Sequence, residues 1–159
     1  MKPRIVVSRC LGFEACRWNG EIIRSEALGR LRDSVDFVTV CPETGIGLGT
    51  PRKPIDLRLI DGEIRVTQKE TGRDMTDELE AFSEGFLDRL GDIDGFILKS
   101  RSPSCGLGTT KIHNDSGVSL GSGVFASRVE RRYGGHVIID EDELREMGAE
   151  AFLRLVSEP

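Results

Sequence analysis

The stretch Arg4-Ile5-Val6-Val7-Ser8-Arg9-Cys10 is a short β-branched run that leads into a cysteine. The same arrangement occurs twice more: residues 36–40 run into Cys41, and residues 95–99 lead through a short polar segment to Cys105. Such runs, bounded by Gly, Pro and polar residues, predict strands, and their alternation with helical patterns predicts a parallel sheet. Because loops at the carboxyl ends of parallel strands line one crevice, these three cysteines are predicted to converge there.

The composition is typical of a soluble globular protein: 38% of the 159 residues are hydrophobic, 31% are charged, and the formal net charge is -5. The length suits one domain, which we expect to span residues 1–159. No block of Lys and Arg forms a phosphate-binding stripe, which argues against a stable complex with long DNA or RNA. We find no pattern of a secretory signal or a membrane span, and therefore expect a cytoplasmic protein with reduced cysteines. The sequence leaves the oligomeric state open.

The rest of the chain adds helices and one clear hairpin. Asp61-Gly62 between two apolar runs predicts a tight turn, and Thr76 is a candidate cap for a helix with one apolar stripe. Residues 100–121 read as a long polar loop, whose length suggests a function. The predicted elements are a helix at 25–32, hairpin strands at 55–60 and 63–67, a helix from 76, a helix at 123–133, a strand at 136–139 and a helical region to 156. We predict an α/β fold: a three-layer Rossmann-like domain with a mainly parallel sheet and a small β-hairpin excursion.

The converging cysteines leave three chemistries open: a zinc site, a reactive thiol and an iron–sulfur cluster. Structural zinc sites usually contain closely spaced cysteine pairs, which this chain lacks, and only His113 and His136 could add nitrogen ligands. A nucleophilic thiol needs a nearby base, and no Cys/His pair stands out. Ligands of iron–sulfur clusters can lie far apart in sequence. Three thiolates on a four-iron cluster would leave one iron open to bind a soft sulfur-containing ligand.

Cys16 follows no strand-like run, and two interpretations remain for it. As a fourth ligand it would close the open iron, and the protein would be a sensing or sulfur-carrying module without turnover. As a small semi-buried hydrophobic residue it would leave the site open. We favour the second interpretation.

Four motifs, which together cover nearly the whole chain, carry a family resemblance. They are Cys10-Leu11-Gly12 with Arg17-Trp18-Asn19-Gly20; Cys41-Pro42-Glu43 with Gly47-Leu48-Gly49 and Pro51-Arg52; Thr71-Gly72 with Asp74 and Thr76; and Lys99-Ser100-Arg101-Ser102-Pro103-Ser104-Cys105-Gly106. In these motifs the chain resembles the thiouracil desulfurase family. Ser-Pro-Ser-Cys-Gly together with Cys-Pro-Glu is the most specific part of the resemblance.

The resemblance implies a 4Fe-4S cluster on Cys10, Cys41 and Cys105 with one open iron, and catalytic roles for Glu43 and Ser102. The implied reaction is the desulfuration of a thiolated pyrimidine such as 2-thiouracil, in which water replaces sulfur, hydrogen sulfide leaves and no net redox change occurs. The open iron would act as a Lewis acid on the thiocarbonyl sulfur. We expect Glu43 to manage protons in a partly dry site that favours its protonation, and Ser102 to orient the substrate or relay a proton.

Two points remain open. Arg52 could bind a substrate carbonyl or anion, or form a solvated ion pair. The expected partner is a small thiolated base, but thiouridine in tRNA is an alternative substrate. The acidic net charge counts against tRNA, whose binding depends on basic surface.

Overall fold

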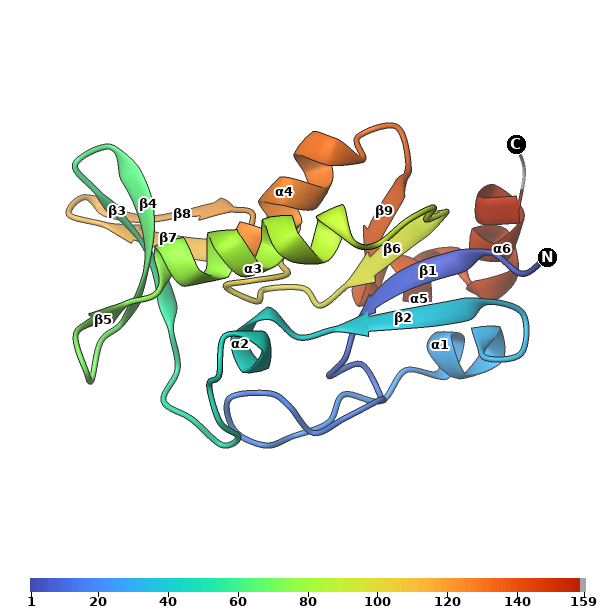
Figure 1. Cartoon of the computed structure of the whole chain (residues 1–159), viewed down its shortest axis with the longest axis horizontal. Coiled ribbons are helices and arrows are strands. Elements are labelled where there is room, and N and C mark those ends of the chain that lie inside the picture. The colour runs from blue at the N-terminus through green and yellow to red at the C-terminus, as the bar shows by residue number, and fades with distance from the viewer. Residues whose placement is uncertain (158–159) are drawn as a thin grey trace.

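Four parallel strands form the sheet that carries the cysteine loops, as the computed structural model shows (Figure 1). The structure describes residues 1–157. The strand order is β2-β1-β6-β9, with β1 at Arg4–Ser8, β2 at Asp36–Val40, β6 at Gly95–Leu98 and β9 at Val137–Asp140. All three neighbouring pairs are parallel. Strand β6 is buried along its whole length, which explains its continuous apolar run. The mainly parallel sheet of the predicted α/β fold is confirmed.

Helices cover both faces of this first sheet and complete three layers. One face packs against α1 (Glu26–Leu31), α5 (Glu141–Met147) and α6 (Ala149–Ser157). The other packs against α3 (Thr76–Asp88) and α4 (Val124–Arg132). Phe152 on α6 and Phe125 on α4 are fully buried, and each such ring contributes about 1.5–3 kcal/mol of hydrophobic stabilisation.

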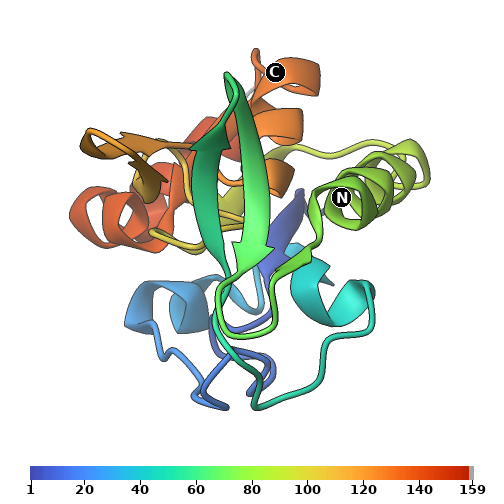
Figure 2. The ribbon, with the colours of Figure 1, turned by 90° about the vertical axis from the view of Figure 1, so that its left-hand side faces the viewer.

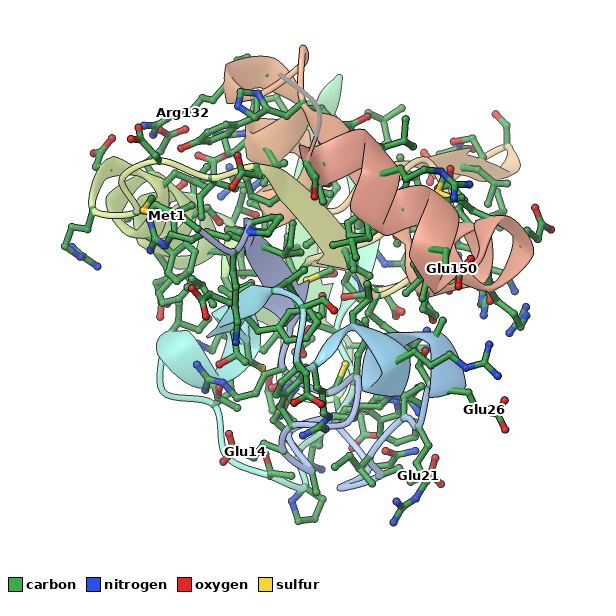
Figure 3. The ribbon with its side chains drawn as sticks, turned by 90° about the vertical axis from the view of Figure 1, so that its right-hand side faces the viewer. Met1, Glu14, Glu21, Glu26, Arg132 and Glu150 are labelled. Carbon is green, nitrogen blue, oxygen red and sulfur yellow. The ribbon has the colours of Figure 1, made fainter. Side chains whose placement is uncertain are left out.

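Charged side chains lie around the outside of these layers. Figure 3 shows the end of the molecule that is formed by the first sheet and its helices. The labelled Glu26 and Glu150 on α1 and α6 and Arg132 on α4 are exposed. In the part of the chain that the structure describes, none of the helices is long and apolar enough to cross a bilayer.

The second sheet is larger than the sequence predicted. It has five strands in the order β5-β4-β3-β7-β8: β3 at Asp56–Ile60, β4 at Glu63–Gln68, β5 at Arg73–Asp74, β7 at Thr110–Asn114 and β8 at Gly117–Gly121 (Figure 2). Residues 100–121, expected to form a long loop, therefore contain the β7–β8 hairpin. The sequence signal was weak because β8 is largely exposed and β7 joins the sheet through a non-local parallel pairing with β3.

The predicted turn at Asp61-Gly62 is confirmed. Both residues have positive φ, 51° for Asp61 and 81° for Gly62, as a two-residue hairpin turn requires. The antiparallel register continues directly from Ile60 to Glu63. The twist that this turn allows keeps β3 and β4 paired along their length.

Thr76 does not cap helix α3, contrary to the sequence prediction. It is the first residue of the helix, and its Oγ1 accepts a hydrogen bond from the Val66 N–H (2.7 Å). Met75 is the N-cap residue and makes no side-chain capping bond, whereas Asp74 Oδ1 accepts from both the N–H and the hydroxyl of Thr76 (3.0 and 2.7 Å). The third family motif is thus a structural joint between the second sheet and α3.

Asp74→Asn is expected to lower stability at neutral pH and to lose this effect in acid. The hydrogen bond from Arg65 (2.8 Å) and those from Thr76 lower the pKa of Asp74 from its ordinary 3.8 to about 2. The charged form therefore stabilises the fold above about pH 4, and the contribution disappears as the pH falls toward 2. Asparagine keeps an acceptor for Thr76 but loses the charge. Urea unfolding at pH 7 and at pH 2–3 measures the difference from the wild type.

The effect should be small, since the Asp74 side chain is 38% exposed and solvent screens the pair. Glu63→Gln is the matched control, because Glu63 lies 3.9 Å from the same Arg65 but is 75% exposed. A pH-independent loss in Asp74→Asn would assign the effect to the hydrogen bonds and not to the charge.

Candidate functional site

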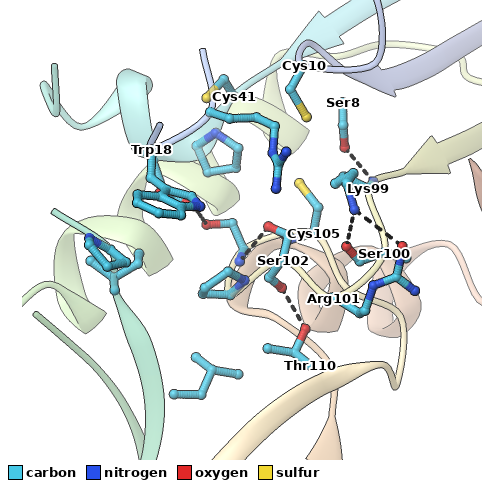
Figure 4. Close-up of a pocket in the computed structure, with 18 of the residues that line it drawn as sticks. Ser8, Cys10, Trp18, Cys41, Lys99, Ser100, Arg101, Ser102, Cys105 and Thr110 are labelled. Atoms are coloured by element: carbon cyan, nitrogen blue, oxygen red, sulfur yellow. Dashed lines mark hydrogen bonds between the residues drawn. The ribbon is translucent and has the colours of Figure 1, made fainter. Parts of the chain in front are cut away.

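A pocket of about 750 Å³ lies where the first sheet meets the second, and all four cysteines line it. Cys10 follows β1, Cys41 follows β2 and Cys105 lies in the loop after β6, so their strands deliver them to one edge of the sheet. The close-up in Figure 4 shows the sulfur atoms of Cys10 and Cys105 facing a common space, with Cys41 nearby and its sulfur turned away from them. The predicted convergence of the three strand-end cysteines is confirmed.

Backbone contacts position Cys10 and Cys41. The carbonyl of Cys10 accepts from the Ile23 N–H (2.8 Å), which closes the loop between β1 and α1. Cys41 has extended backbone at the start of the one-turn helix α2 (Pro42–Gly45), where Pro42 has the φ that a first helical position needs. Because of this turn, Cys41 and Glu43 both line the pocket.

Ser102 holds the turn that presents Cys105. Its Oγ accepts hydrogen bonds from the N–H groups of Ser104 (3.1 Å) and Cys105 (3.0 Å). The Thr110 hydroxyl donates to the Ser102 carbonyl (2.6 Å) and ties the turn to β7. Helix α4 begins directly behind it at Gly123, where an added Cβ would lie 2.5–2.6 Å from the backbone of Pro103 and Ser104. Only glycine allows this close approach.

Burial keeps two of the thiols protonated in the absence of a cation. Burial, and secondarily the neighbouring Cys41, raises the pKa of Cys10 to about 11. Burial also raises the pKa of Cys105, although Ser8 opposes this by hydrogen bonding to its sulfur. A metal centre would reverse the balance, because thiols that coordinate a metal are deprotonated.

Cys16 is buried beside Cys41, and the two thiols interact directly. The interaction between them lowers the pKa of Cys41 to about 6 and raises that of Cys16. The Cys41 Sγ also lies 4.0 Å from the Cys16 carbonyl oxygen. Cys16 is therefore packed as a buried thiol at the edge of the pocket, next to a candidate ligand.

The sulfur-lined wall suits an iron–sulfur cluster. Zinc bonds sulfur at about 2.3 Å and gathers its ligands around one point, whereas thiolates of a four-iron cluster bind different irons. Within residues 1–157, no three Cys, His, Asp or Glu side chains are close enough together to hold one metal ion. His113 lines the pocket, whereas the ring of His136 packs edge-on against Tyr133 with centroids 5.1 Å apart. The donor chemistry and the pocket volume both fit the larger group.

Glu43 is buried and has partners on both carboxylate oxygens. Arg52 directs its Nε and Nη2 at Oε1, each at 3.1 Å, and the Ser104 hydroxyl lies 3.2 Å from Oε2. Of the two alternatives for Arg52, the structure therefore shows an ion pair, but a buried one and not a solvated one.

A family model of 2-thiouracil desulfurase matches residues 5–142. The chain belongs to this family. It is also 35% identical over 155 residues to the uncharacterized protein YbbK of Bacillus subtilis (strain 168), with 90% of this chain and 99% of that protein covered. Among solved structures it is similar to the 4Fe-4S-dependent thiouracil desulfidase TudS, with a TM-score of 0.68, 32% identity, and 91% of this chain and 95% of that chain covered. The family predicted from the four motifs is confirmed.

This member of the 2-thiouracil desulfurase family has a second buried ion pair that the sequence did not reveal. Glu141, the first residue of α5, accepts from the N–H and the hydroxyl of Ser100 (2.6 and 3.0 Å) and pairs with Lys99 (3.0 Å). Its signal in the sequence was its position after the strand-like run of β9, because that strand ends at the same edge of the sheet. Lys99 and Ser100 also line the pocket.

Proposed function

We propose that this chain is a desulfidase for a thiolated pyrimidine such as 2-thiouracil. The reaction converts the thiocarbonyl and one water into a carbonyl and hydrogen sulfide, without net redox change. The observation that carries the proposal is one pocket in which three strand-end thiols lie beside a buried carboxylate and a serine turn. Membership of the 2-thiouracil desulfurase family and the likeness to TudS support the same chemistry.

Cys10, Cys41 and Cys105 are the proposed ligands of a 4Fe-4S cluster with one open iron. Cys16 is left out, because it lies in the loop between β1 and α1 and does not directly follow a strand of the first sheet. When bound, such a cluster supplies a Lewis acid that takes a soft thiocarbonyl sulfur. The rest of the reaction falls to the side chains of the pocket.

Glu43 and Ser102 are the proposed proton managers. A charged Glu43 can accept a proton from the attacking water and return it to the departing sulfur. The Ser102 oxygen is occupied by two backbone N–H groups, so its remaining capacity is to donate its own hydrogen to the substrate. Ser102 therefore combines a structural bond to the Cys105 turn with a free donor.

Anaerobic reconstitution of the full chain is expected to give about four irons and four sulfides per protein, with broad visible absorption. The loaded protein should then release sulfide from 2-thiouracil in equal amounts with uracil. Iron and sulfide analysis together with chromatography of the base provide the measurement. A colourless protein with stoichiometric zinc would contradict the proposal. The amount of uracil that forms from 2-thiouracil without the enzyme serves as the blank.

Thiouridine in tRNA is the second candidate substrate, and the rim of the pocket favours it. Arg17, Arg101 and Lys111 line the pocket and place cations at its opening, although Arg17 pairs with Glu21 (3.4 Å) and Arg101 with Asp142 (3.0 Å). Such charge attracts phosphates. Sulfide release from free thiouracil but none from thiolated tRNA would decide for the small base.

A further inference from the structure

The guanidinium of Arg52 forms hydrogen bonds with protein groups around the pocket. Its side chain is only 7% exposed. Two of its nitrogens face Glu43, and its Nη1 donates to the Gly49 carbonyl (3.1 Å) and the Thr50 hydroxyl (3.3 Å). Its backbone N–H donates to the Trp18 carbonyl (2.7 Å). The arginine thus joins the first and second family motifs and keeps its charge on Glu43.

Glu43 is consequently held from two sides. A carboxylate offers about four acceptor positions on its two oxygens. Arg52 occupies Oε1 twice, and the Ser104 hydroxyl occupies Oε2 once. The position that remains on Oε2 is the one available to a group inside the pocket that Glu43 lines.

We infer that Arg52 and Ser104 are positioning residues that fix Glu43 with one free acceptor for the substrate water; this inference rests on the proposed function. A free glutamate side chain has several rotamers, and a displacement of about 1 Å at a reacting group can cost about 10²-fold in rate. The planar fork of arginine fixes the carboxylate plane, and a lysine ammonium cannot replace it. Ser104, which lies in the turn that carries Cys105, holds the second carboxylate oxygen of Glu43 in place.

Arg52→Met and Ser104→Ala test this in the reconstituted protein. Arg52→Met should lower kcat by about 10²-fold while KM stays within a few-fold, and Arg52→Lys should not restore it. Millimolar guanidinium should restore part of the kcat of Arg52→Met. Ser104→Ala should lower kcat less, and Ser104→Thr should recover it. The matched control is Arg128→Met, which removes a 17% exposed arginine that pairs with Glu80 and Glu84 outside the pocket.

A raised KM with unchanged kcat would make Arg52 a substrate-binding residue and overturn the inference. A second measurement does not need activity: urea unfolding of Arg52→Met, Glu43→Gln and the double variant, on the full chain as purified. Because either single change leaves the charge of the buried partner without its counter-charge, the two decreases in the urea midpoint should be clearly non-additive. Additive losses would overturn the inference. If the wild type releases no sulfide, the proposed function fails. The unfolding measurements on the two single variants and the double variant then decide alone whether Arg52 and Glu43 are coupled.

Discussion

Cys105→Ser is expected to reduce the iron bound after anaerobic reconstitution from about four atoms per chain to background. Cys105 is buried in a turn that Ser102 and Gly123 hold in place, so no other residue of that turn can take over its role. A serine hydroxyl is a hard donor and a poor substitute for a soft thiolate. Iron and sulfide analysis and the visible absorption of the reconstituted protein measure the loss. Cys10→Ser and Cys41→Ser should behave in the same way.

Cys16→Ser is the matched control for this prediction, because it changes a buried thiol in the same pocket. The variant should keep both iron and activity, since Cys16 is not a proposed ligand. If Cys16→Ser lost iron as severely as Cys105→Ser, all four thiols would be ligands. The open iron would then be closed, and the protein would be a module without turnover.

Glu43→Gln is expected to lower the rate of sulfide release by about 10²–10⁴-fold and to leave the iron content unchanged. The amide fills the same space and can still bond to Arg52 and Ser104, but it cannot take a proton from water. Steady-state rates with 2-thiouracil, normalised to bound iron, provide the measurement.

Glu14→Gln separates this effect from a general loss of negative charge near the site. Glu14 is exposed and lies 3.6 Å from Arg9, outside the set of residues that line the pocket. This control should react at the wild-type rate. A near-normal rate in Glu43→Gln with its cluster intact would show that the carboxylate is structural, and the proposed mechanism would be wrong.

The first sheet could be predicted from the sequence because its strands read as short apolar runs, of which β1 and β6 are almost entirely buried. The limits of β2 agree with the expected residues 36–40, and those of β6 and β9 differ by one residue. The β7–β8 hairpin could not be predicted in this way. Its strands carry few buried apolar residues, and its place depends on pairing with a strand far away in the chain.

The candidate site also contains features that could be predicted from the sequence and features that could not. The cysteines could be placed together because strand ends of a parallel sheet share an edge, which is a property of the fold. The partners of Glu43 could not, because Arg52 and Ser104 reach it from two separate loops whose paths no local pattern determines. For the same reason, sequence reasoning identified Glu43 as acidic and buried but omitted the cation that faces it.

The position of β6 has a consequence for how the protein matures. Strand β6 lies between β1 and β9 in the first sheet, and Cys105 follows it. A nascent chain that has left the ribosome as far as β2 already contains Cys10, Cys16 and Cys41. It lacks the central neighbour of β1 and the turn that carries the last proposed ligand. On the proposed ligation, a cluster held by all three cysteines would form only after Cys105 has been synthesised, and a translation product that ends at β2 would contain most of the thiols but lack the third ligand.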